Sequence, residues 1–144
     1  MADICINNNS IMFTGDGGIA SLYVNKTGEI SVKGKLVKLG TANNSVILTG
    51  NDDVNCIGAI YTAGVADTGN IWVATKGKVK VLLGDNVGCS VGQWAECGTA
   101  GYANAQASPA AAPEHFQEIG HFTETVSATG AGTFVLATID MHFN

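Results

Sequence analysis

The sequence predicts an all-β protein that folds as a small single-domain β-barrel or β-clip. Short apolar and β-branched runs recur along the 144 residues, and clusters of Gly, Asn and Asp separate them. No segment sustains a helical period over three turns. Gly is abundant, at 19 residues, and charged residues are only 13% of the chain. This composition is typical of a rigid β module with many tight turns.

The candidate strands follow one another at short spacing, each bounded by turn residues. They are Ile11–Thr14, Ile19–Val24, Glu29–Val32, Lys35–Leu39, Ser45–Leu48, Asn55–Ala63, Asn70–Thr75, Lys78–Leu83, Val91–Ala95, Ile119–Val126 and Thr133–Phe143. The last strand alternates clearly, so one face of it should pack inward. The inward set is Val135, Ala137, Ile139, Met141 and Phe143, and the outward set is Phe134, Leu136, Thr138, Asp140 and His142.

Two stretches fall outside the strand pattern. Residues 1–18 predict a flexible N-terminal arm, and residues 19–144 form the β domain. Residues 99–113 are rich in Ala and hold both prolines, which predicts a long surface loop. The arm is too short and polar to build a core, yet its apolar residues can dock on a partner. These candidate contact residues are Ile4, Ile6, Ile11 and Phe13.

Two basic segments resemble each other. Lys33–Gly40 and Lys76–Gly84 each contain a lysine-rich strand entered by one Gly and closed by another. This similarity indicates either a pseudo-symmetry of two hairpins or chance convergence on the strand pattern. No third unit exists to suggest a solenoid.

The charged residues exclude several partners. All seven basic residues are Lys, and the net charge is −5. Specific nucleic-acid binding relies on Arg forks and positive charge, so no nucleic-acid partner is expected. No apolar run reaches the roughly 18–20 residues of a membrane span, and no secretory signal opens the chain. We therefore expect synthesis in a cytoplasm and no membrane contact.

The sequence contains no recognisable catalytic or metal-binding pattern. No Ser lies in a nucleophile elbow, and no histidine has the partners of a catalytic triad. The four cysteines form no C-x-x-C pair, and a zinc site from Cys89, Cys97 and His115 or His121 matches no known spacing. Buried free thiols are the better interpretation. We expect no enzymatic activity, no cofactor and no metal.

The order of hydrophobic and glycine positions resembles a known family. It runs through 32–40, 56–60, 69–83, 91–94, 118–122 and the closing strand to Phe143. This order is similar to that of the capsid decoration (cement or auxiliary head) proteins of tailed bacteriophages. The resemblance covers roughly residues 30–143 and rests on generic positions.

The resemblance implies a non-enzymatic virion protein on the outer surface of an assembled capsid. Its partner would be the major capsid protein, and it would act as a homotrimer that stabilises the shell. Two other classes stay open. One is a head-fibre or receptor-binding β module of a virion. The other is a β-clip enzyme of the dUTPase kind, against which the absence of Arg argues.

Overall fold

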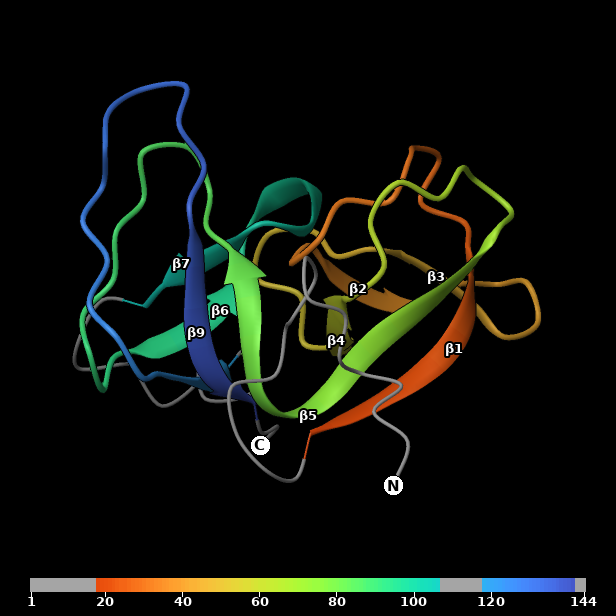
Figure 1. Cartoon of the computed structure of the whole chain (residues 1–144), viewed down its shortest axis with the longest axis horizontal. Helices are drawn as coiled ribbons and strands as arrows, with labels where there is room; N and C mark the ends of the chain where they lie inside the picture. Colours follow the sequence, from red (N-terminus) through yellow and green to blue (C-terminus); the bar gives the residue numbers. More distant parts are fainter. Residues whose placement is uncertain (1–17, 107–117, 142–144) are drawn as a thin grey trace.

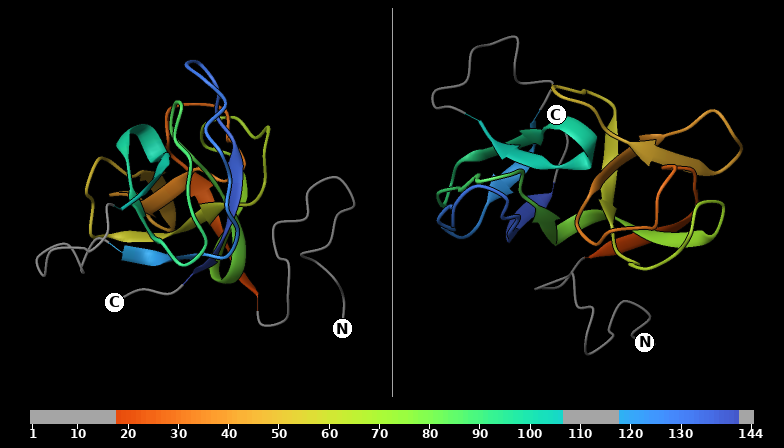
Figure 2. Two further views of the ribbon diagram at one scale, coloured as in Figure 1. Left: turned by 90° about the vertical axis from the view of Figure 1, so that its left-hand side faces the viewer. Right: turned by 90° about the horizontal axis from the view of Figure 1, so that it is seen from above.

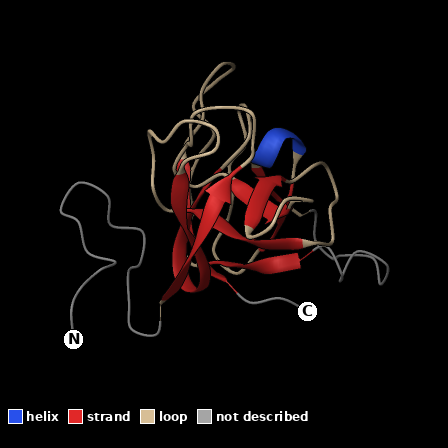
Figure 3. Ribbon diagram, turned by 90° about the vertical axis from the view of Figure 1, so that its right-hand side faces the viewer, coloured by secondary structure: helices blue, strands red, loops and turns tan. Residues whose placement is uncertain are grey.

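The computed structural model describes residues 18–106 and 118–141. This part of the chain forms nine strands and a single turn of 3-10 helix (Figures 1 and 3), so the predicted all-β barrel class is confirmed. The strands are β1 Ile19–Asn25, β2 Leu36–Leu39, β3 Ser45–Leu48, β4 Cys56–Ile60, β5 Asn70–Leu82, β6 Trp94–Cys97, β7 Ala103–Ala105, β8 Glu118–Phe122 and β9 Leu136–Met141, and the helical turn is η1 Thr99–Gly101.

The first five strands close into a barrel. Around its ring they follow the order β1, β3, β2, β4 and β5, and β5 pairs back onto β1. The pairing of β1 with β3 is parallel, whereas the others are antiparallel. Alternate residues point inward, and the buried interior set is Val37, Val46, Ile60, Ile71 and Val73. Each such side chain contributes about 1.5–3 kcal/mol of hydrophobic stabilisation.

Strand β5 carries the chain from this barrel into a second one. Its first half pairs with β1 and β4, and its second half, from Gly77 to Leu82, pairs with β9. Gly77 lies where the pairing changes and has a φ of 100°, a conformation that glycine adopts without strain. The strand bends sharply on its way between the barrels (Figure 1). The sequence predicts two strands here, Asn70–Thr75 and Lys78–Leu83, because Lys76 and Gly77 are typical of a turn. The structure instead has the single strand β5.

The remaining strands form a second ring in the order β5, β9, β8, β6 and β7. A parallel bridge between Leu83 and Ala103 brings β7 back to the end of β5. Seen from above, the two rings lie side by side (Figure 2). The buried interior set of this second barrel includes Val79, Val81, Ala95, Phe122 and Ile139.

The two barrels have the same connectivity and the same register. In each, the first and third strands are parallel, and the second strand pairs with the fourth across a bulge. The bulge follows Val37 in β2 and Ala95 in β6, and these residues pair with Gly58 and Gly120 respectively. A Cβ at either glycine would collide with a backbone carbonyl of the adjacent strand. The chain is therefore a tandem repeat of one barrel unit, approximately residues 19–76 and 77–141.

Backbone hydrogen bonds outside the strands repeat in the same way. The amide of Gly34 donates to the carbonyl of Ile60 at 2.9 Å, and the amide of Gly92 donates to that of Phe122 at 2.8 Å. Both glycines have positive φ, 87° and 82°. Gly34 is thus equivalent to Gly92. The resemblance of Lys33–Gly40 to Lys76–Gly84 is therefore not the repeat, because Lys33–Gly40 corresponds to residues 91–98.

Some predicted segments differ from the structure, and others lie outside the residues that it describes. Residues 29–32 form a loop that hydrogen bonds hold against residues 62–65. The Ser31 hydroxyl donates to the Thr62 carbonyl at 2.6 Å, and the Ser31 amide donates to the Val65 carbonyl at 2.8 Å. The predicted loop 99–113 contains η1 and β7 up to residue 105, and residues 107–113 lie outside the described residues. The predicted arm lies outside them too, except for Gly18. In the last strand Ala137, Ile139 and Met141 are buried as predicted.

Candidate contact surface

Large apolar side chains gather on the surface where the two barrels meet. The ring of Tyr102 stacks on the ring of Phe134, with centroids 4.7 Å apart. The ammonium of Lys35 lies 4.8 Å from the centroid of the same Tyr102 ring. Leu136 lies against Gly34, since a Cβ built there would be 2.8 Å from its Cδ2 atom. We call Glu29, Lys35, Tyr102, Phe134 and Leu136 the seam cluster.

The seam cluster is open to solvent at its apolar members. Phe134 is 44% exposed and Leu136 is 38% exposed. The adjoining segment, residues 29–35, also exposes Ile30 and Val32, and it runs over the upper side of the first barrel toward the second (Figure 1). Aromatic anchors with aliphatic neighbours are common at the centres of protein–protein contacts. The cluster is therefore suited to binding another protein surface.

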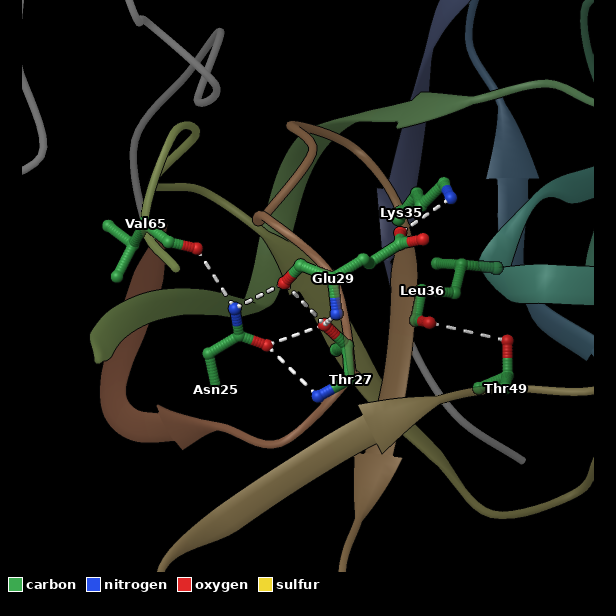
Figure 4. A network of polar contacts seen from close by, with 7 residues as sticks. All are labelled: Asn25, Thr27, Glu29, Lys35, Leu36, Thr49 and Val65. Atoms are coloured by element: carbon green, nitrogen blue, oxygen red, sulfur yellow. Dashed lines mark hydrogen bonds and ion pairs between the residues drawn. The ribbon is translucent and has the colours of Figure 1, made fainter. Parts of the chain in front are cut away.

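A buried asparagine holds this segment in place (Figure 4). Asn25, fully buried at the end of β1, donates from its side-chain amide to the carbonyls of Glu29 and Val65, both at 3.0 Å. Its side-chain oxygen accepts from the amide of Thr27 at 3.0 Å and from the Thr27 hydroxyl at 2.6 Å. This is an Asx turn, and it fixes the backbone that presents Glu29.

An ion pair links this turn to the aromatic rings. Lys35 is 6% exposed, and its ammonium lies 2.7 Å from Oε1 of Glu29. A buried ammonium requires such a partner, and the face of Tyr102 adds a cation–π contact. The pKa of the nearby Lys33 is lowered, first by burial and then by the charge of Lys80. The seam cluster thus combines a fixed charge pair with the exposed ring of Phe134 and the half-buried ring of Tyr102.

The repeat shows that the barrel fold does not require these apolar side chains. From the matched strand pairings, the positions equivalent to Tyr102, Phe134 and Leu136 in the first barrel are Ser45, Thr68 and Asn70. All three are polar. The aromatic and aliphatic side chains are therefore specific to the surface where the two barrels meet, and a barrel of this kind forms without them.

A second exposed region lies at the other end of β2. Leu39 is 59% exposed, and two shallow, open depressions lie on either side of it. One is lined by Lys38, Asn55, Cys56 and Ile57, and the other by Tyr23 and the turn of residues 40–45. Neither resembles an enclosed small-molecule pocket.

The cysteines are placed as buried side chains. Cys56, Cys89 and Cys97 are all buried, as the sequence predicts, and Cys5 lies outside the described residues. The pKa of Cys56 is raised well above its usual range, first by its hydrogen bond with the Cys97 thiol and then by burial. Cys89 instead contacts the Glu124 carbonyl at 3.5 Å. Cys89 and Cys97, the two cysteines of the zinc site considered from the sequence, thus contact different groups.

Within residues 18–106 and 118–141, no group of three or more His, Cys, Asp or Glu side chains is arranged to hold a metal ion. In the same part of the chain, no helix has the length and apolar character needed to cross a membrane.

The structure does not test the contact residues predicted in the arm. Ile4, Ile6, Ile11 and Phe13 all lie outside the described residues. The seam cluster was missed by sequence reasoning, although one signal was present. The outward face of the last strand begins with Phe134 and Leu136, two large apolar residues where polar ones are expected.

Comparison with solved structures finds a similar fold. No protein-family model matches the sequence, and no curated protein matches it. A solved structure, the head fiber gp8.5 N base in bacteriophage phi29, is similar with a TM-score of 0.55 and 12% sequence identity. The match covers 89% of this chain and 100% of that chain. At this identity the likeness is one of fold, and it extends over nearly the whole two-barrel architecture.

Proposed function

We propose that this chain is a non-enzymatic structural protein of a bacteriophage particle, attached to the outside of the head. The observation that carries the proposal is the fold shared with the head fiber N base, which matches over its full length. The order of glycine and hydrophobic positions supports the same setting independently, through its resemblance to capsid decoration proteins. Both supports agree on a virion protein and differ in its task.

Two tasks fit this setting. As the base of a head fibre, the chain anchors a further element to the head, and the likeness to a head fiber base favours this task. As a decoration protein, it clamps neighbouring subunits of the major capsid protein and stabilises the shell. Heating capsids with and without bound protein separates the two. A clamp that bridges neighbouring subunits binds only the assembled shell and raises its disassembly temperature, whereas a base that binds a single subunit does not.

The seam cluster is the surface that we assign to the capsid contact. Burying Phe134 and its neighbours on another protein removes apolar area from water, at about 25 cal/mol per Å². Binding only the assembled lattice stabilises that lattice by mass action. A homotrimer multiplies a weak single contact through effective concentration. The proposed state on the particle is therefore a trimer on the major capsid protein.

A sedimentation assay tests this assignment. Capsids assembled without this chain are mixed with purified protein, and the bound fraction is measured in the capsid pellet. Phe134→Ala should lower binding at least tenfold, since aromatic anchors typically contribute about 2 kcal/mol or more. Val91→Ala is the control, because Val91 is 63% exposed and outside the seam cluster. Equal binding by the Phe134 variant would place the contact elsewhere, and no binding by the wild type would refute attachment to the head.

A further inference from the structure

The second barrel contacts the first through one of its turns. The turn after β6, which contains η1, sits on the end of β2 and β3 in the first barrel. The amide of Gly101 donates to the carbonyl of Thr49 at 2.9 Å, and the carbonyl of Cys97 accepts from the amide of Asp52 at 3.0 Å. Cys97 and Thr49 are almost fully buried by this contact, at 0% and 2% exposure.

The first barrel carries an equivalent turn that is one residue longer. Residues 41–44 of that turn are all exposed, whereas in the second barrel Gly101 is buried and only Thr99 and Ala100 are exposed. Cys97 corresponds to Leu39, because they hold matching positions in the β6–β7 and β2–β3 pairings. Gly40 donates to the Ser45 carbonyl at 2.9 Å, as Gly98 donates to that of Tyr102 at 2.7 Å. Leu39 is 59% exposed. The unit that docks in the second barrel is thus presented outward, with a large apolar side chain, in the first.

The second barrel carries the matching receiving face. Leu36 and Thr49, which receive η1, correspond to Trp94 and Gln106, since Thr49 donates to Leu36 at 3.1 Å and Gln106 donates to Trp94 at 2.9 Å through their backbones. Trp94 is half-buried, and its ring centroid lies 3.6 Å from that of His121. The side chain of Gln106 is 4% exposed, and neither of its polar atoms has a hydrogen-bond partner among the described residues. A buried amide without a partner calls for an explanation, and backbone groups of a turn docked beside it would supply the missing partners.

We propose that copies of this chain associate head to tail. Leu39 and the turn of residues 40–45 of one copy dock on the Trp94 and Gln106 face of the next, as Cys97 and η1 dock on the first barrel within the chain. A head-to-tail contact uses two different surfaces, so it forms a ring when the rotation closes. Three copies give a ring of six barrels. This interface specifies how the copies of the proposed trimer contact one another. It is argued from the repeat and does not depend on capsid binding.

Sedimentation equilibrium over a range of concentrations tests the contact with a matched pair of variants. Leu39→Lys places an unpaired charge in the proposed interface, which is costly to bury. It should raise the concentration of half-dissociation at least tenfold. Leu22→Lys is the control, because Leu22 is 49% exposed and the equivalent position in the second barrel is already Lys80. This control should leave the association unchanged, and unchanged melting temperatures confirm that both variants fold.

Mixing identifies the head-to-tail geometry. Gln106→Lys blocks the receiving face and Leu39→Lys blocks the docking turn, so each is monomeric alone and an equal mixture forms dimers. If Gln106→Lys does not fold, the Leu39→Lys result decides alone. A wild type that is monomeric at every concentration, or an unaffected Leu39→Lys variant, overturns the interface. Capsid binding is measured separately, so a monomeric protein that still binds capsids refutes this interface and leaves the proposed function standing.

Discussion

Replacing Asn25 with alanine tests how the seam cluster is held. The substitution removes four side-chain hydrogen bonds, two donated to the carbonyls of Glu29 and Val65 and two accepted from Thr27. The two carbonyls keep other donors, from the Thr27 hydroxyl and the Ser31 amide, whereas the Thr27 amide loses its partner. Net values near 1 kcal/mol per hydrogen bond give a loss of about 2–4 kcal/mol in the free energy of unfolding.

The measurement is chemical and thermal unfolding of the purified protein. For a domain of this size, that loss should lower the melting temperature by about 8–16 °C, at roughly 4 °C per kcal/mol. The control is Asn51→Ala, because Asn51 is exposed and its side-chain amide bonds the carboxylate of its neighbour Asp52, at 2.7 Å. Its expected effect is within about 0.5 kcal/mol.

The same variant also links stability to the contact surface. Without Asn25, the turn no longer fixes Glu29, and Lys35 loses its positioned partner beside Tyr102. Capsid binding should therefore fall, even at temperatures at which the variant is fully folded. A melting temperature within about 2 °C of the wild type, where the hydrogen bonds predict a larger drop, would refute the role of Asn25 as the organiser of this segment.

Other substitutions test the barrels and their side chains. Gly58→Ala and Gly120→Ala should each destabilise the fold by about 1–3 kcal/mol in denaturant melts, because the new Cβ meets a backbone carbonyl; a neutral effect of both would contradict the shared register. The pKa of Glu124 is lowered, first by its hydrogen bond from Thr138, so its contribution is complete above the ordinary value of 4.5 and is lost as pH falls below it. Between about pH 6 and about pH 3, the melting temperature of Glu124→Gln should fall less steeply than that of the wild type. Parallel curves would show that this carboxylate does not contribute to the pH dependence of stability. Alkylation under denaturing conditions should label all four cysteines, and mass spectrometry that finds an unlabelled pair would show a disulfide.

Most of the strands could be predicted because their alternation is local. Ser45–Leu48 is found with the predicted bounds, and the buried face of β9 is found as predicted. The strand β7 could not be predicted, since its sequence is Ala-Asn-Ala and alanine has weak strand preference. Pairing with β6 stabilises it there, and the buried Ala103 takes the place that Val46 holds in the first barrel.

Neither the repeat nor the seam cluster could be predicted from local sequence patterns, and the reason is the same for both. The two barrels preserve pairing register and glycine positions while most side chains differ, so similarity of residues pointed to the wrong pair of segments. Phe134 and Leu136 stand out on the outward face of a strand, but only the long-range topology brings Tyr102 and Lys35 beside them. Contacts between residues far apart in the chain carry no periodic signal.

The central claim is that this chain is a structural protein on the outside of a phage head. A cryo-electron microscopy reconstruction of the native particle tests it most directly. We expect density for the two-barrel fold on the outer surface of the head, with Phe134 and Tyr102 against the major capsid protein and three copies in contact at each site. A particle whose head carries no such density, or that lacks this chain altogether by mass spectrometry, would contradict the claim.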